Sequence, residues 1–168
     1  DEITVVDELR TAAMDIAILA EKLPSEDPKF DALYVIVEQK QEQTNNKLIV
    51  FSTFRHTLAY LERRLLEKEV RVGVVHGGVA DEERQKLRKR FEAPAEEATA
   101  LDVLLFSEVG CEGLDYQFCD GMVNYDLPWN PMRIEQRIGR IDRRSQKSEA
   151  VAIYNIITVD TIDADIYD

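Results

Sequence analysis

The chain has 168 residues, of which 45% are hydrophobic and 32% are charged, with only 7 Gly and 5 Pro. This composition excludes a disordered or fibrous protein and predicts one compact globular unit with a sizeable apolar core. The formal net charge of -12 excludes a surface that attracts nucleic acid everywhere, so any phosphate contact must be local.

The apolar runs are too short to cross a bilayer and no signal-peptide pattern precedes them, so we expect no membrane partner and a cytoplasmic location. The first residue is Asp1 rather than Met, so a preceding segment can be missing. Cys111 and Cys119 lack a Cys-x-x-Cys spacing, and the two histidines are His56 and His76. We therefore expect no metal site and treat both cysteines as small apolar side chains.

The N-terminal part of the chain reads as two helices. Residues 1–22 carry apolar side chains at three- and four-residue spacing, and a second helix is predicted over about 28–41. A polar turn at 41–46 follows. We interpret residues 1–45 as a helical extension that packs on the main domain, which comprises residues 46–168.

From residue 47 onward, short apolar runs alternate with amphipathic segments, a pattern typical of β-α-β units and of a parallel sheet buried on both faces. The predicted strands are 48–52, 70–75, 103–106, 121–125 and 150–157. Helices are predicted over about 56–69, 81–91 and 132–142, with a loop over 92–100 and a short helix after Thr161.

Ligands of open parallel sheets bind at the carboxyl ends of the strands, and unusual residues follow several of the predicted strands. The first strand is followed by residues 52–55 and the second by His76-Gly77-Gly78. Paired glycines let the backbone approach a ligand closely, although a tight turn explains them equally well. After the third strand, the glycine-containing loop 107–115 can wrap a nucleotide sugar, with Asp115 accepting hydrogen bonds from its hydroxyls. A turn with Asp115 as a helix cap is the alternative.

The region from Arg133 to Lys147 has six basic residues against Glu135 and Asp142, a local balance of +4. In a helix, four of the arginines share one stripe, namely Arg133, Arg137, Arg140 and Arg144. Like charges at this spacing destabilise a helix, so the stripe predicts a bound anion. Arginine suits phosphate oxygens, and it stabilises the charge that develops on a transferred γ-phosphate. A basic face for RNA or protein contact is the alternative.

With these segments in this order, the chain resembles the second RecA-like lobe of superfamily 2 helicases and translocases over residues 27–168. The similar segments are 47–64 for motif IV, 72–91 for the following His-Gly segment, 107–115 for motif V and 136–143 for motif VI. The resemblance implies an α/β fold, a RecA-like parallel sheet flanked by helices on both faces, without a phosphate loop.

Within the superfamily, residues 125–131 resemble the Asp-x-x-Trp-Asn-Pro turn of SWI/SNF-type translocases. The pair Ser107-Glu108, combined with the segment 136–143, is similar to the bacterial RNA-polymerase-associated branch. Many eukaryotic SWI/SNF-type proteins carry Asp where this chain has Gly139. This difference favours a bacterial or phage-defence context over nucleosome remodelling.

The resemblance implies roles for particular residues. Arg140 and Arg143 are expected to act as arginine fingers on ATP bound by a preceding lobe, and Gly113 and Asp115 to approach the ribose. Gln136 and Arg137 are expected to couple the nucleotide site to the nucleic-acid track. The residues expected to contact the phosphate backbone are Thr53, Arg55, Gly77, Gly78 and Ser107.

The sequence contains neither a Gly-x-x-x-x-Gly-Lys-Ser/Thr phosphate loop nor an acidic Mg²⁺ box, and phosphoryl transfer needs both. We therefore expect ATP and Mg²⁺ to be bound mainly by an N-terminal RecA-like lobe of the same polypeptide, and the isolated chain to be inactive.

The function expected is the C-terminal motor lobe of a nucleoid-associated ATP-dependent translocase on double-stranded DNA, with RNA as a further candidate substrate. RNA polymerase or a defence or restriction complex are candidate partners. The alternatives are a strand-separating helicase or restriction motor, and a non-catalytic scaffold that binds nucleic acid or protein.

Overall fold

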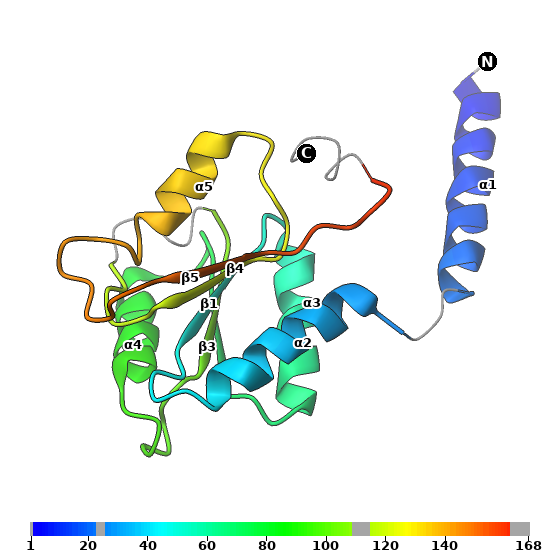
Figure 1. Cartoon of the computed structure of the whole chain (residues 1–168). Coiled ribbons are helices and arrows are strands. Elements are labelled where there is room, and N and C mark those ends of the chain that lie inside the picture. Colours follow the sequence, from blue (N-terminus) through cyan, green and yellow to red (C-terminus); the bar gives the residue numbers. More distant parts are fainter. Residues whose placement is uncertain (1, 23–25, 109–114, 162–168) are drawn as a thin grey trace.

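The computed structural model describes residues 2–22, 26–108 and 115–161, and its central feature is a parallel sheet of five strands (Figure 1). The strands are β1 (Leu48–Phe51), β2 (Val72–Val75), β3 (Val103–Phe106), β4 (Gly121–Asn124) and β5 (Ala152–Asn155). Their order in the sheet is β2-β3-β1-β4-β5, and every neighbouring pair is parallel. The predicted parallel α/β sheet is therefore confirmed.

Helices cover both faces of the sheet, as predicted. The helices are α1 (Glu2–Glu21), α2 (Pro28–Gln41), α3 (Arg55–Glu67), α4 (Asp81–Glu92) and α5 (Pro131–Ile138). Buried side chains of α2 and α3 belong to one apolar cluster, and those of α4 belong to a second cluster on the opposite face. The half-buried Ile138 at the end of α5 packs against the second cluster.

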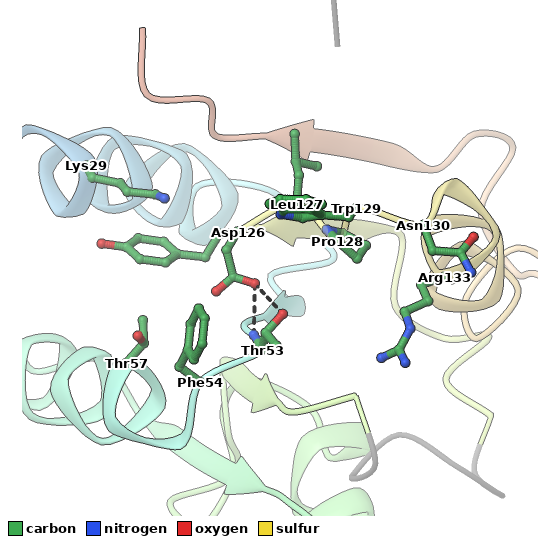
Figure 2. Close-up of a pocket in the computed structure, with 11 residues that line it drawn as sticks. Lys29, Thr53, Phe54, Thr57, Asp126, Leu127, Pro128, Trp129, Asn130 and Arg133 are labelled. Carbon is green, nitrogen blue, oxygen red and sulfur yellow. Dashed lines mark hydrogen bonds between the residues drawn. The ribbon is translucent and has the colours of Figure 1, made fainter. Parts of the chain in front are cut away.

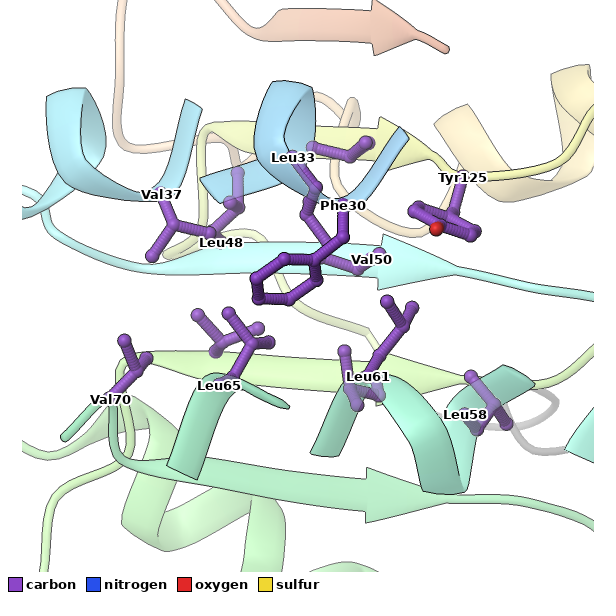
Figure 3. Packing of buried hydrophobic residues seen from close by; sticks show 13 residues of the cluster. Phe30, Leu33, Val37, Leu48, Val50, Leu58, Leu61, Leu65, Val70 and Tyr125 are labelled. Atoms are coloured by element: carbon purple, nitrogen blue, oxygen red, sulfur yellow. The ribbon is translucent and has the colours of Figure 1, made fainter. Parts of the chain in front are cut away.

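Alternate residues of the central strand point into the two clusters. Leu48 and Val50 belong to the first cluster, whereas Ile49 and Phe51 belong to the second. Because both sets are buried, β1 reads as a continuous apolar run rather than an alternating one. Figure 3 shows Phe30 pointing from α2 into the space between β1 and α3.

The strand β5 differs from its prediction. It spans residues 152–155 rather than 150–157, and its side chains are exposed apart from the half-buried Tyr154. It lies at the end of the described sheet, paired with β4. A run of residues with high strand propensity predicts a strand but not its position in the sheet. The side chains of a strand at the edge can stay exposed to solvent.

The two N-terminal helices have different environments. The side chains of α1 from Val6 to Lys22 are exposed, and Figure 1 shows this helix standing apart from the sheet. The helix α2 instead buries three residues in the core, among them Phe30 and Leu33. A domain boundary after residue 45 stays a prediction. Among the described residues, no helix combines the length and apolar character needed to cross a membrane.

The helix carrying the basic segment is shorter than predicted. It ends at Ile138, with Gly139 as its C-cap, rather than continuing to residue 142. Glycine lowers the stability of a helix interior, so Gly139 favours the end of α5. The turns after Gly139 place Ile141, which is fully buried, in the second apolar cluster. The prediction that one helical stripe comprises Arg133, Arg137, Arg140 and Arg144 is therefore wrong, because Arg140 and Arg144 lie beyond the end of α5. The short helix predicted after Thr161 lies outside the described residues.

Candidate functional site

A surface pocket of about 360 Å³ lies at the carboxyl ends of the strands. The segments after β1, β2 and β3 meet there, together with one residue of α5. Its lining residues are Thr53, Arg55, Gly77, Gly78, Ser107, Glu108 and Arg133. All five residues predicted to contact a phosphate backbone therefore line one pocket. Glu108 and Arg133 also line the pocket, although no local pattern in the sequence predicted them as members of this group.

The loop after β1 is held by a residue that follows β4. The backbone N–H and the hydroxyl of Thr53 donate to Oδ1 of Asp126, at 2.8 and 2.9 Å, and Ser52 Oγ donates to Oδ2 at 2.5 Å. Because β1 and β4 are neighbours in the sheet, residues far apart in sequence meet at this edge. Asp126 thus sets the position of Thr53 in the pocket.

The His76-Gly77-Gly78 segment forms a tight turn that faces the same pocket. The Gly78 N–H donates to His76 Nδ1 at 3.0 Å, and the Val79 N–H donates to the His76 carbonyl at 3.0 Å. A Cβ at position 78 would lie only 3.1 Å from the His76 ring, so the turn favours glycine there. The turn and the phosphate-contact interpretation are therefore compatible.

Arg137 is a core residue rather than a surface one, with 1% of its area exposed. Its Nη1 donates to Asn124 Oδ1 at 2.8 Å and to the Asp126 carbonyl at 3.0 Å, and its Nη2 donates to Glu108. The guanidinium also lies over the Phe51 ring, 5.1 Å from the ring centre. Both terminal nitrogens are thus committed to protein acceptors, and a coupling role for Arg137 stays a prediction.

Glu108 contacts two arginines of α5. One carboxylate oxygen accepts from the buried Arg137, and the other lies 3.9 Å from Arg133 Nη1. The Glu108 side chain is 18% exposed and the Arg133 side chain is 53% exposed. Glu108 therefore connects a buried cation to one that faces solvent at the pocket.

Two residues predicted at the nucleotide pair with each other. Arg143 Nη1 donates to Asp115 Oδ2 at 2.8 Å, and Arg143 Nε donates to the Gly139 carbonyl at 2.9 Å. Arg88 Nε donates to the Asp115 carbonyl at 3.0 Å, which ties this position to α4. The residues directly after Asp115 form a turn rather than a helix, so the helix-cap alternative has no support here. Gly113 lies outside the described residues.

Arg140 follows α5 and is half-buried. Its Nε is buried and, within the described part of the chain, has no hydrogen-bond acceptor. A buried donor without an acceptor is costly, and an anion at this position would satisfy it. Gln136 lies on the exposed side of α5. The role of Arg140 as an arginine finger and that of Gln136 at the nucleotide stay predictions.

A second pocket of about 600 Å³ shares Thr53 and Arg133 with the first. Figure 2 shows Lys29 reaching toward it from α2 and Arg133 from α5. Trp129 is 72% exposed and is one of the side chains that line it. The described residues contain no group of three or more His, Cys, Asp or Glu side chains that could hold a metal ion.

Comparison with curated proteins finds two groups of bacterial relatives. The chain is 35% identical over 148 residues to an uncharacterized ATP-dependent helicase, YqhH of Bacillus subtilis, covering 88% of this chain and 25% of that protein. It is 39% identical over 115 residues to the RNA polymerase-associated protein RapA of Vibrio campbellii, covering 68% of this chain and 12% of that protein. The chain thus spans a quarter or less of these relatives.

Solved structures share the fold. The C-terminal part of the Fun30 ATPase domain matches with a TM-score of 0.75 and 23% identity, covering 95% of this chain and 52% of that one. The Hef helicase domain of Pyrococcus furiosus matches with a TM-score of 0.66 and 27% identity, covering 97% of this chain and 33% of that one. The family model of the helicase conserved C-terminal domain matches residues 28–145, and the chain belongs to that family.

Proposed function

We propose that this chain is the C-terminal motor lobe of an ATP-dependent translocase on double-stranded DNA. A preceding RecA-like lobe of the same polypeptide would bind ATP and Mg²⁺, and the two lobes would close on the nucleotide. The observation that carries the proposal is the pocket at the carboxyl edge, where Arg55, Arg133 and exposed glycine backbone face one small cavity. A sequence-independent phosphate contact needs these groups.

The charge distribution supports a local nucleic-acid contact. The chain carries a net charge of -12, yet two arginines line the 360 Å³ pocket. The adjoining pocket adds Lys29 and the exposed aromatic rings of Phe54 and Trp129. Cations and exposed rings are the groups that bind phosphates and bases without reading sequence.

On the nucleotide side, we propose that Arg140 and Arg143 act as arginine fingers toward the γ-phosphate. The Nε of Arg140 supports this role, because it is a buried donor without an acceptor among the described residues and a phosphate oxygen would satisfy it. Asp115 would turn to the ribose when ATP replaces it as the partner of Arg143. Gln136 and Arg137 would couple this side to the nucleic-acid pocket.

The fingers are tested in the complete parent protein with Arg140→Ala and Arg143→Ala. Arginine fingers contribute factors of about 10³ to 10⁵ to turnover, so DNA-stimulated ATP hydrolysis should fall at least a hundredfold in each variant. Arg144→Ala is the matched control, since Arg144 is an exposed arginine of the same turn. Wild-type turnover in both finger variants would show that neither arginine reaches the nucleotide.

The motor activity on DNA is tested by comparing translocation along a duplex with unwinding of a duplex. Displacement of a triplex-forming strand without separation of a duplex would support a translocase, whereas duplex separation would support a helicase.

The relative RapA is an RNA polymerase-associated protein, so co-purification of the parent protein with RNA polymerase tests that partner. A defence or restriction complex remains the other proposed context.

A further inference from the structure

A third pocket lies beside the edge strand β2, next to the pocket proposed to bind phosphate. Its volume is about 550 Å³, and its lining residues are Arg55, His56, Ala59, Glu62, Val74 and His76. Arg55 also lines the 360 Å³ pocket, so the two pockets adjoin at this side chain. The function proposed above gives no role to this pocket or to the two histidines, which are the only ones in the chain.

Two donors at the adjoining end of the third pocket are free of protein partners. Within the part of the chain that the structure describes, Arg55 and His56 form no side-chain hydrogen bond or ion pair. Both side chains are exposed, and the first turn of α3, which is described in full, contains no acid. The helix dipole opposes positive charge at the start of a helix, so an anion bound there would offset an unfavourable arrangement.

The ring of His76 supplies a third donor. Its Nδ1 accepts from the Gly78 N–H at 3.0 Å, so the neutral ring carries its proton on Nε2, which stays available to a ligand. From α4, Arg84 Nη2 donates to the His76 carbonyl at 3.4 Å. A proton on Nδ1 would break the bond from Gly78, so the charge of the pocket changes through His56, whose ring has no such bond.

The acid in the third pocket lies at its other end. Among the described lining residues, the only acid is Glu62, which follows Arg55 by seven residues, or about 10 Å along a helix. The remaining lining side chains are those of Ala59 and Val74, which are small and apolar. An anion is therefore favoured at the carboxyl edge of the sheet, where α3 begins and His76 follows β2.

We propose that the third pocket holds a further phosphate of the nucleic-acid backbone, bound by Arg55, His56 and His76. The proposal rests on the function proposed above and extends the phosphate contacts by one site beyond the 360 Å³ pocket. Phosphates repeat along a nucleic-acid strand, so one strand can occupy both pockets, with Arg55 between them. Histidine changes charge between about pH 5 and 8, so a lower pH strengthens this contact.

The first experiment measures the binding of a fluorescent DNA duplex to the complete parent protein at pH 8 and pH 6, in a buffer without phosphate. His56→Gln should leave the dissociation constant unchanged at pH 8 and raise it about threefold to tenfold at pH 6, where histidine carries a charge and glutamine does not. The logarithmic salt slope of the wild type should be steeper at pH 6 by up to about 0.9, the effect of one neutralised phosphate. Equal dissociation constants of the two proteins at both pH values would overturn the inference.

Ala59→Glu tests the third pocket without relying on titration. Ala59 is exposed, so the substitution spares the core while it adds a second carboxylate to the pocket. The dissociation constant for the duplex should rise about tenfold. Leu66→Glu adds the same charge to α3 outside the pocket, at a side chain that is 53% exposed, and should change binding less than about twofold.

Unchanged DNA binding in Ala59→Glu would overturn the inference and would leave the pocket, at most, a site for free anions. A wild-type parent protein that binds no duplex at either pH would instead refute the proposed function.

Discussion

Replacing Arg137 with Met tests whether this arginine is a core residue of the sheet edge. The substitution keeps the apolar stem and removes the guanidinium, which is 1% exposed and bonds to Asn124, the Asp126 carbonyl and Glu108. Breaking a buried pair by removing one partner costs about 3 to 5 kcal/mol. Since the Glu108 side chain retains 18% exposure, we expect a loss near 3 kcal/mol.

Urea unfolding of the 168-residue chain, followed by far-ultraviolet circular dichroism, measures this loss. With a slope of about 2 kcal/mol per M, the midpoint should fall by about 1.5 M. Adding Glu108→Gln should restore about 1 kcal/mol or more, because the carboxylate no longer lacks a cation. Arg144→Met, at an exposed position, should change stability by less than about 0.5 kcal/mol. A loss below about 1 kcal/mol in Arg137→Met would refute the buried network.

Three further predictions concern other parts of the chain. Burial opposes ionisation of Asp27, but hydrogen bonds from Tyr60 and from the start of α2 outweigh it and lower the carboxyl pKa below 3.8. Stability from this residue is therefore lost as the pH falls below about 5, and Asp27→Asn should flatten the dependence between pH 5 and 2 in urea titrations. Burial raises the pKa of the Cys119 thiol to about 12, so iodoacetamide at pH 8 should modify it only after unfolding. Rapid labelling of Cys119 itself in the native chain, located by peptide mass spectrometry to separate it from Cys111, would contradict this. Removing residues 1–22, whose side chains are exposed from Val6 onward, should change the unfolding free energy by less than about 1 kcal/mol, whereas Phe30→Ala should cost about 3 to 5 kcal/mol.

Much of the fold could be predicted because its signals are local. Runs such as Leu48–Phe51 and Val103–Phe106 are apolar at every position, which indicates strands buried on both faces. The spacing of apolar residues likewise predicted α1, α2 and α4 to within about two residues. The order of the motifs along the chain was enough to identify the family that the comparisons support.

The errors lie where long-range contacts override local pattern. Periodicity placed Arg137 on an exposed stripe, yet acceptors from β4 and Glu108 draw it into the core. The same pattern extended α5 beyond Gly139, where burial of Ile141 favours a turn. Neither acceptor lies near Arg137 in the sequence, so no local signal predicts its burial.

By itself, the sequence determined the element types, the parallel α/β class and the residues that follow each strand, because these depend on spacing along the chain. Only the tertiary structure decided that β1 lies between β3 and β4, and so brings Thr53, Ser107 and Asp126 to one edge. It also decided that Glu108 stands between a buried arginine and an exposed one. Sheet order and side-chain pairing depend on which segments pack together, and packing energy is a property of the whole chain.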